Sequence, residues 1–300
     1  MEAGANVAPE TPENGRDTKI YRPMKKSAKL LTPVLAIAVG ITAATALAEG
    51  NPADGVTVPE GYSRLVFSDE FDADGAPDPA KWNFETGYIR NGEMQYYTPG
   101  QNAVCKDGLL IIEARNDSVN IGGELCPVTS ASLTTKDRQA WKYGYVEVRA
   151  KLPASLGTWP AIWMMPQEDN YGKWPRSGEI DIMEHVGYNP EKVHFSAHTE
   201  RFNHMRGTQR THVIHAPEAV GDFHIYALKW TPDRLTWYYD GAEQYAIDRE
   251  ADSDWTTWPF DIDYYLILNL AFGGGWGGSE GVDLSSLPQR YEIDYVRVFQ

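Results

Sequence analysis

The chain has 300 residues, of which 42% are hydrophobic and 12% aromatic, and its formal net charge is −15. These apolar side chains suffice for a large core, and an all-β fold of this length can form a single domain. The acidic excess makes a nucleic-acid backbone a poor partner and weakly disfavours polyanionic substrates.

Residues 1–48 have the features of an N-terminal extension followed by an export signal. From Met24, three lysines precede a mostly apolar run, and Ala46–Ala48 supplies a small-residue cleavage site. We therefore predict a translation start at Met24 and a secreted or periplasmic protein. The alternative is an uncleaved anchor, but Pro33 makes this run a poor membrane span. Without residues 1–48 the chain has 21 basic and 38 acidic side chains, a net charge of −17.

The rest of the chain has neither internal repeats nor a low-complexity linker. We assign residues 49–60 to a short leader and residues 61–300 to one domain. We expect a monomer with no membrane contact once the signal has been removed.

Cys105 and Cys126 flank a strand-like run at residues 109–115. Export would permit a disulfide, and we expect the two cysteines on neighbouring strands. Two cysteines do not define a disulfide framework, so a bridge and two buried thiols both remain open. Neither cysteine has neighbours at zinc-ligand spacing, so this pair does not predict a metal site.

Short runs of β-branched and aromatic residues dominate the domain, and helical periodicity is scarce. Turn signals at Thr231–Arg234 and Asp240–Gly241 connect successive runs. Many short strands without intervening helices predict an all-β fold, either an antiparallel sandwich or a jelly roll. The expected strands span residues 143–152, 161–165, 179–184, 192–199, 224–230, 235–241, 264–272 and 291–299.

The segment WPRSGEIDIMEHVG, residues 174–187, contains Glu179, Asp181 and Glu184. Side chains alternate between the faces of a strand, so Glu179 and Asp181 share one face and Glu184 points to the other. A β-bulge near Met183 would insert one residue and return Glu184 to the shared face. The two glutamates would then lie four strand positions apart, roughly 13 Å between Cα atoms.

Three carboxylates on one strand face repel one another, and burial increases the cost. A solvent-facing acidic strand or a calcium site would explain them without catalysis, but Ile180 and Ile182 indicate that the opposite face is anchored in a core. Nearby tryptophans offer flat apolar surfaces for sugar rings, with core packing as their alternative role. Glutamates leaning together could bring their carboxyl groups to about 5–5.5 Å, as retaining glycoside hydrolysis requires.

The motifs GTWPAIWMMP (157–166), GEIDIMEHVG (178–187) and EIDYVRVF (292–299) resemble glycoside hydrolase family 16, in its laminarinase-like branch. The segments NGEMQYYT (91–98) and AHTERFNHMRGTQ (197–209) strengthen the resemblance, which covers the chain from about residue 61 onward. It implies a concanavalin-like β-jelly roll sandwich with a concave substrate cleft and a bulged catalytic strand.

The resemblance implies that Glu179 is the nucleophile, that Glu184 is the general acid/base, and that Asp181 hydrogen-bonds Glu179. Ionised Glu179 would attack the anomeric carbon while protonated Glu184 donates to the leaving oxygen. Esterification of Glu179 would remove its charge, so Glu184 would become more acidic and act as base toward water. Because the three titrations are coupled, pH–rate limits would belong to the cluster.

The resemblance also implies substrate contacts. For His198, a hydrogen-bonded polar role on a strand is the alternative. The histidines at 194, 198, 204, 212 and 215 do not predict a metal site, because they fall in a substrate-side loop region and no His-Glu-x-x-His motif is present. The expected contacts are Asn91, Glu93, Trp159, Trp163, Trp174, His198 and Gln209, with Trp276 capping the cleft from a mobile glycine-rich loop.

No cofactor is expected for catalysis. The resemblance implies a structural Ca²⁺ on the convex side, held by the Glu70 and Asp294 side chains and the Gly108 carbonyl, since calcium prefers oxygen ligands. The alternative is that Asp294 belongs to a hydrogen-bond network.

The predicted function is retaining endo-hydrolysis of β-1,3-glucan, with mixed-linkage β-1,3/1,4-glucan as a second substrate left open. The alternatives are an agarase- or carrageenase-type galactan hydrolase, a transglycosylase, and a non-catalytic β-glucan-binding protein. Retention of both glutamates argues against a binding protein, and the acidic charge argues against a sulfated galactan.

Overall fold

The structure, a computed structural model, describes residues 56–121 and 123–300, which belong to one compact unit. The predicted extension, the Met24 start, the signal segment and most of the leader lie outside the described residues. No helix in the described ranges has the length and apolar character needed to cross a bilayer.

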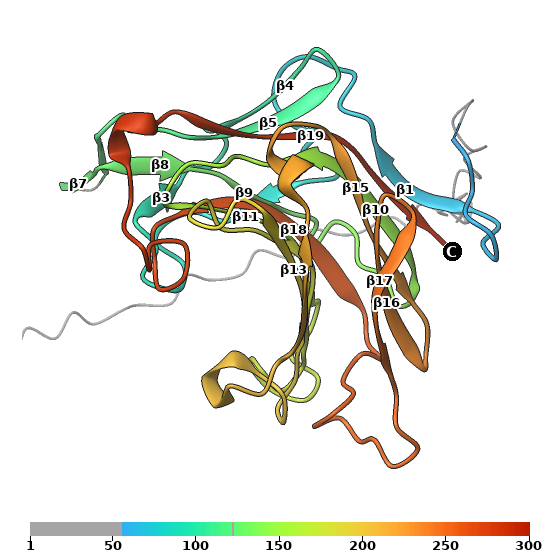
Figure 1. Ribbon diagram of the computed structural model, residues 1–300. Helices are drawn as coiled ribbons and strands as arrows, with labels where there is room; N and C mark the ends of the chain where they lie inside the picture. The colour runs from blue at the N-terminus through green and yellow to red at the C-terminus, as the bar shows by residue number, and fades with distance from the viewer. Residues whose placement is uncertain (1–55, 122) are drawn as a thin grey trace, which may run out of the picture. The chain divides into compact units, whose positions relative to one another are not determined.

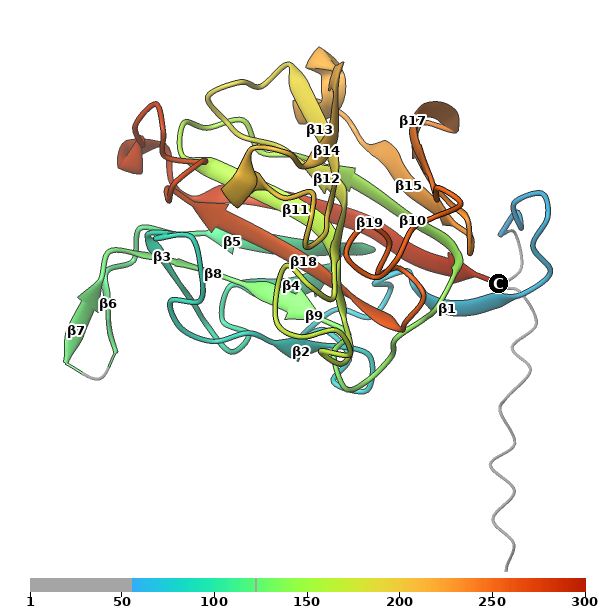
Figure 2. The ribbon, with the colours of Figure 1, turned by 90° about the horizontal axis from the view of Figure 1, so that it is seen from below.

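Two large antiparallel sheets form the unit (Figures 1 and 2). The larger sheet has the order β17–β16–β15–β10–β19–β5–β4, and β1 also pairs with β19. Its strands are β1 (Leu65–Asp69), β4 (Ala103–Lys106), β5 (Leu109–Ala114), β10 (Gly144–Lys151), β15 (His224–Trp230), β16 (Arg234–Tyr239), β17 (Ala242–Asp248) and β19 (Gln289–Phe299).

The smaller of the two sheets has seven strands in the order β14–β13–β12–β11–β18–β9–β2. They are β2 (Asn83–Phe84), β9 (Ser132–Thr134), β11 (Thr158–Pro166), β12 (Glu179–Glu184), β13 (Lys192–His198), β14 (Arg210–His215) and β18 (Tyr264–Phe272).

Short accessory elements complete the described part of the chain. Strand β3 (Gln95–Tyr97) pairs in parallel with β8 (Val128–Ser130), and β6 (Val119–Ile121) pairs with β7 (Glu124–Cys126). Three 3₁₀ turns are η1 (His204–Arg206), η2 (Pro217–Val220) and η3 (Leu284–Ser286). The all-β jelly-roll sandwich expected from the sequence is confirmed.

The core lies between the inner faces of the two large sheets. In the seven-stranded sheet, alternate residues such as Ile162, Ile180 and Leu268 are fully buried and join one cluster with Val148 and Trp237 of the other sheet. The period-two alternation of the strands therefore leaves the other face of the seven-stranded sheet available for a site.

The two cysteines differ from the sequence-based placement. Cys105 lies on β4, which pairs with β5, whereas Cys126 lies on β7, which pairs with β6, so they are not on neighbouring strands. Both are buried, and no disulfide joins them. Burial raises the pKa of the Cys105 thiol to about 11, because removal from water disfavours the thiolate.

Candidate active site

A cleft of about 980 Å³ lies over the outer face of the seven-stranded sheet. Its floor consists of alternate residues of neighbouring strands: Glu179 and Asp181 on β12, Ser196 and His198 on β13, and Trp163 on β11. Because the intervening residues of these strands pack into the core, the same alternation that builds the sandwich directs the polar set into the cleft.

A β-bulge in β12 brings Glu184 onto this floor. Asp181 pairs with Trp163 on β11 and Met183 pairs with the adjacent Ile162, so Ile182 is the extra residue. Ile182 and Met183 are both fully buried in the core. The bulge predicted near Met183 is therefore confirmed.

The partner strand β13 shows the spacing that results. Glu179 lies opposite His198 and Glu184 lies opposite His194, so the two glutamates occupy floor positions four residues apart. At about 3.3 Å per residue, four positions place the Cα atoms roughly 13 Å apart, within reach of two glutamate side chains that lean together.

Burial dominates the electrostatics of the three acids. Burial, and then the charge of Asp181, raise the pKa of Glu179 to about 8 against the opposing effects of His198 and Arg90. Burial and then Asp181 raise the pKa of Glu184 to about 8, against the opposing effects of His198 and of a hydrogen bond from Trp159. Each carboxyl therefore favours its protonated form at neutral pH, and the cluster resists carrying several negative charges at once.

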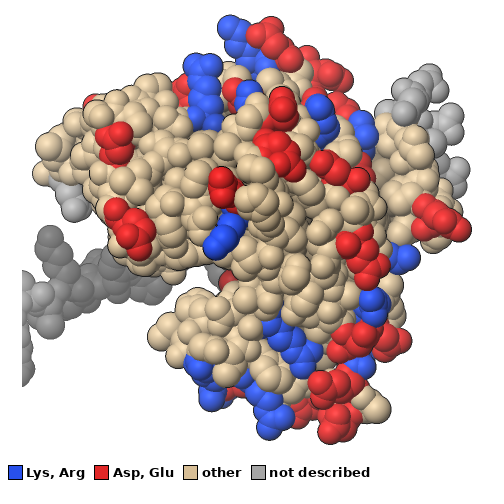
Figure 3. Space-filling model, in the orientation of Figure 1, with Lys and Arg blue, Asp and Glu red and all other residues tan. Residues whose placement is uncertain are grey.

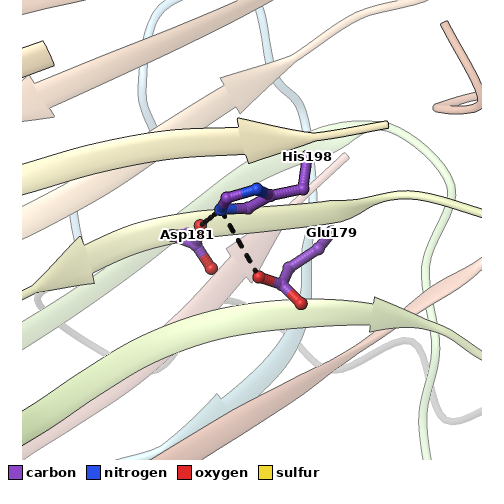
Figure 4. A group of neighbouring side chains, drawn as sticks. All are labelled: Glu179, Asp181 and His198. Atoms are coloured by element: carbon purple, nitrogen blue, oxygen red, sulfur yellow. Dashed lines mark ion pairs between the residues drawn. The ribbon is translucent and has the colours of Figure 1, made fainter. Parts of the chain in front are cut away.

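Asp181 lies between the glutamates and interacts with both Glu179 and His198. Burial raises the pKa of Asp181 to about 8, and a hydrogen bond with Glu179 opposes the shift. His198 Nε2 lies 3.2 Å from Asp181 Oδ2 and 3.7 Å from Glu179 Oε1 (Figure 4). The expected contact between Asp181 and Glu179 is present, and His198 belongs to the carboxylate cluster itself.

Aromatic side chains stand on both sides of the carboxylates. Near Glu184, the Trp159 Nε1 donates a hydrogen bond to Glu184 Oε1 at 3.1 Å, and the rings of Trp159 and His194 each meet Trp276 edge-on. On the Glu179 side, Trp174 lies 4.9 Å from the His204 ring, centroid to centroid. The carboxylates thus lie between two apolar walls suited to sugar rings.

The turn before β3 fixes the glycine-rich loop at one wall. Asn91 Nδ2 donates to Glu93 Oε1 at 3.1 Å, and the Asn91 carbonyl accepts from the Gly275 N–H at 2.9 Å. A Cβ at Gly277 would lie 2.9 Å from the Cβ of Trp159, so glycine allows this loop to approach the wall closely. Trp276 is therefore held by packing on both sides.

All eight side chains predicted to contact substrate line the cleft. Sequence reasoning missed other lining residues. The expectation of a histidine-bearing loop was wrong for 212 and 215, which lie on β14, whereas 194 and 198 lie on β13, as the strand expected at residues 192–199 predicted. The four-residue offset between 194 and 198 places both on one strand face and could have revealed His194. The other missed lining residues include Arg90, His204, Met205, Tyr265 and Asn269.

The residues suggested for calcium lie on β19 or next to β1 and β5, two of the strands that pair with it in the eight-stranded sheet. On β19, Val296 pairs with Asp69 of β1 and Ile293 pairs with Leu110 of β5, which brings Glu70, Gly108 and Asp294 near one another along the chain pairings. Both carboxylates are engaged by arginines: Arg297 forms two hydrogen bonds with Glu70, and Arg149 pairs with Asp294. Both side chains would have to exchange these partners to bind an ion.

A β-sandwich with a cleft, a bulged strand carrying a glutamate pair and flanking aromatic walls defines a glycoside-hydrolysing enzyme. Residues 91–297 match the glycosyl hydrolases family 16, and the chain belongs to this family.

Among curated relatives, the β-glucanase of Rhodothermus marinus is 48% identical over 246 residues, covering 79% of this chain and 85% of the relative. The crystal structure of the R. marinus laminarinase superposes with a TM-score of 0.75 at 48% identity, covering 79% of this chain and 96% of the other. A non-specific endo-β-1,3(4)-glucanase of family 16 gives a TM-score of 0.76 at 42% identity, covering 82% and 93%.

Proposed function

We propose that the protein is a retaining endo-β-1,3-glucanase. The observation that carries this proposal is the placement of Glu179 and Glu184 four strand positions apart on the cleft floor, between two aromatic walls. The β-1,3-glucan substrate class is supported by the laminarinase and endo-glucanase relatives.

In the first step, Glu179 attacks the anomeric carbon and Glu184 gives its proton to the leaving oxygen. Arg90 lowers the pKa of Glu179 against the effect of burial, and His198 lowers the pKa of both glutamates, whereas burial favours the protonated form of Glu184. In the second step, the ester at Glu179 carries no charge, so the Glu184 carboxylate left by the first step stays ionised and takes a proton from water. That water attacks the anomeric carbon and breaks its bond to Glu179, which leaves as a carboxylate. Asp181 orients Glu179 through their hydrogen bond.

The charges of the cleft favour a neutral polysaccharide. Among the described lining residues, the single Lys or Arg is Arg90, and it already contacts Glu85. A sulfated galactan would leave its sulfates without basic partners beside a carboxylate cluster. On the face shown in Figure 3, acidic and basic side chains both occur, and several basic ones lie together on the lower part of the view beside acidic ones.

Reducing-sugar release from laminarin, barley β-glucan, agarose and κ-carrageenan tests the substrate class, with Glu184→Gln as the blank. We expect release from laminarin, and activity on barley glucan would add mixed-linkage hydrolysis. Release from a galactan alone would overturn the substrate while retaining the mechanism. Lengthened oligosaccharide products would indicate transglycosylation, and binding without turnover would indicate a β-glucan-binding protein.

We also propose that the protein is exported, because residues 24–48 have the pattern of a cleavable signal. Export suits an enzyme whose polymeric substrate lies outside the cell. N-terminal sequencing of the secreted protein should give a chain that begins near Glu49, and a mature chain that retains residues 24–48 would refute cleavage.

A further inference from the structure

Three potential metal ligands converge on the cleft floor. Glu179, Asp181 and His198 each offer one ligand atom, and these atoms lie within 4.8 Å of one another (Figure 4). Among the described residues, these three form the one group of acidic, histidine or cysteine side chains whose ligand atoms come this close together. The group combines one imidazole with two carboxylates and opens to the cleft.

The distances suit a small divalent cation. Ligand atoms about 2.0–2.1 Å from a tetrahedral zinc ion lie about 3.3–3.4 Å from one another. His198 Nε2 lies 3.2 Å from Asp181 Oδ2 and 3.7 Å from Glu179 Oε1, and all three ligand atoms lie within 4.8 Å of one another, so side-chain rotations could bring them around one ion. An imidazole ligand favours zinc and its transition-metal neighbours over calcium or magnesium.

A second observation points to a ligand at this position. Asp181 is 2% exposed, and its Oδ2 has no hydrogen-bond partner among the described residues although it faces His198 Nε2. A buried, unpartnered carboxylate oxygen is costly, and a cation would satisfy it. A cation would also neutralise the repulsion among the clustered acids, since Asp181 acts on both glutamates.

We propose that Glu179, Asp181 and His198 form an inhibitory binding site for Zn²⁺ or a similar divalent transition-metal ion. The ion takes three protein ligands, and its fourth position faces the cleft. Because the bound ion occupies the carboxylate of the nucleophile, it competes with the polysaccharide. This regulation rests on the proposed hydrolytic function of the same site.

Binding is expected to be reversible rather than structural. Metal-ligating histidines usually donate their second ring N–H to an acceptor, which strengthens the site. His198 Nδ1 is buried and has no such partner among the described residues. The site therefore lacks the outer support of a dedicated metal centre, and a chelator should release the ion.

Calorimetric titration of the full chain with ZnCl₂, alongside inhibition of laminarin hydrolysis, tests the proposal. We expect one ion per chain, competitive inhibition with Ki equal to the calorimetric Kd, and full recovery in EDTA. His198→Ala should weaken binding at least about 10-fold, because loss of even an outer-shell partner costs about 10–100-fold. Asp181→Asn, which keeps the side-chain shape, should weaken binding as well and serves if His198→Ala fails to fold.

His215→Ala is the matched control, because His215 lies on the adjacent strand β14 with a side chain that is 68% exposed. It should bind zinc as the unmodified protein does. Equal affinities in the His198 and His215 variants, or inhibition that is not competitive, would overturn the proposal.

Glu184→Gln separates the two claims, because this variant removes the acid/base but none of the proposed ligands. The variant should hydrolyse no glucan and still bind zinc. His198-dependent zinc binding in an unmodified protein that hydrolyses no glucan would support the metal site and refute the proposed function. Hydrolysis without His198-dependent binding would refute the metal site alone.

Discussion

Trp237, on β16 of the eight-stranded sheet, donates its indole N–H to the main-chain carbonyl of Asp181 on β12, at 2.8 Å. Trp237 is fully buried and belongs to the same core cluster as the bulge residues Ile182 and Met183. The eight-stranded sheet thus fixes the backbone of β12 beside the bulge that returns Glu184 to the cleft face. The same contact therefore supports both the packing of the fold and the geometry of the site.

Trp237→Phe should lower both stability and turnover. Leaving a buried carbonyl without its donor costs about 1–3 kcal/mol. Loosening of the bulge should misalign Glu184 relative to Glu179, so kcat should fall more than KM rises. Urea unfolding and steady-state kinetics on laminarin measure the two effects. A variant with lower stability but unchanged kcat would show that the contact serves the fold alone.

The buried acids should make stability fall as pH rises. Their pKa values are raised from 4.5 or 3.8 in the unfolded chain to about 8 in the fold. Between these limits the folded protein binds more protons than the unfolded chain, so the free energy of unfolding decreases with increasing pH. Glu179→Gln, which carries no charge, should raise Tm by a few °C at about pH 9 and much less at about pH 4, since 1 kcal/mol is about 2–4 °C.

Glu168→Gln provides the control for that experiment, because Glu168 is exposed. Its Tm should follow that of the unmodified protein across the range. If the Glu179→Gln variant gains no more at high pH than at low pH, the raised pKa values of the cluster would be wrong.

The hydrogen bond from Trp159 should tune the acid/base. It lowers the pKa of Glu184, against the larger effect of burial. Trp159→Phe should therefore move the alkaline limit of the kcat/KM profile to higher pH. Trp163→Phe is the matched control, because the Trp163 Nε1 donates to Asn269 at 2.7 Å and not to a carboxylate. An equal shift in both variants would point to lost packing instead.

Calcium bound by Glu70, Gly108 and Asp294 should stabilise the folded protein. A ligand that binds only the folded state raises stability by about 2.7 kcal/mol at 100 times its Kd. We expect CaCl₂ to raise Tm and EDTA to lower it. Arg149→Gln removes the pair with Asp294 but keeps the carboxylate, so it should retain the response, whereas Asp294→Asn should lose it. If neither reagent changes the Tm, the proposed structural calcium site would be wrong.

The strongly patterned strands could be predicted from the sequence. The expected spans 179–184, 224–230 and 264–272 coincide with β12, β15 and β18, because each is rich in β-branched or aromatic residues and has clear limits. The Asp240–Gly241 turn also formed as expected, with φ of 48° and 77° at its two residues. The alternation of side chains between strand faces predicted the bulge, because a strand with one buried face tolerates no other register.

Other features depend on contacts that a linear pattern does not contain. Strand β14 has a mostly exposed, polar composition and forms through pairing with β13 at the sheet edge. Arg90 and Asn269 lie far from β12 in sequence. Arg90 reaches the cleft from the loop between β2 and β3, and Asn269 reaches it from β18. The cysteines fall in separate hairpins, and two residues without a framework give no pairing information.

Double displacement by Glu179 and Glu184 determines the anomeric configuration of the first product. Proton NMR during hydrolysis of a laminari-oligosaccharide resolves the α and β anomers before mutarotation. We expect the β anomer to appear first, because two inversions retain configuration. Initial formation of the α anomer would show a single displacement by water and would contradict the role of Glu179 as nucleophile.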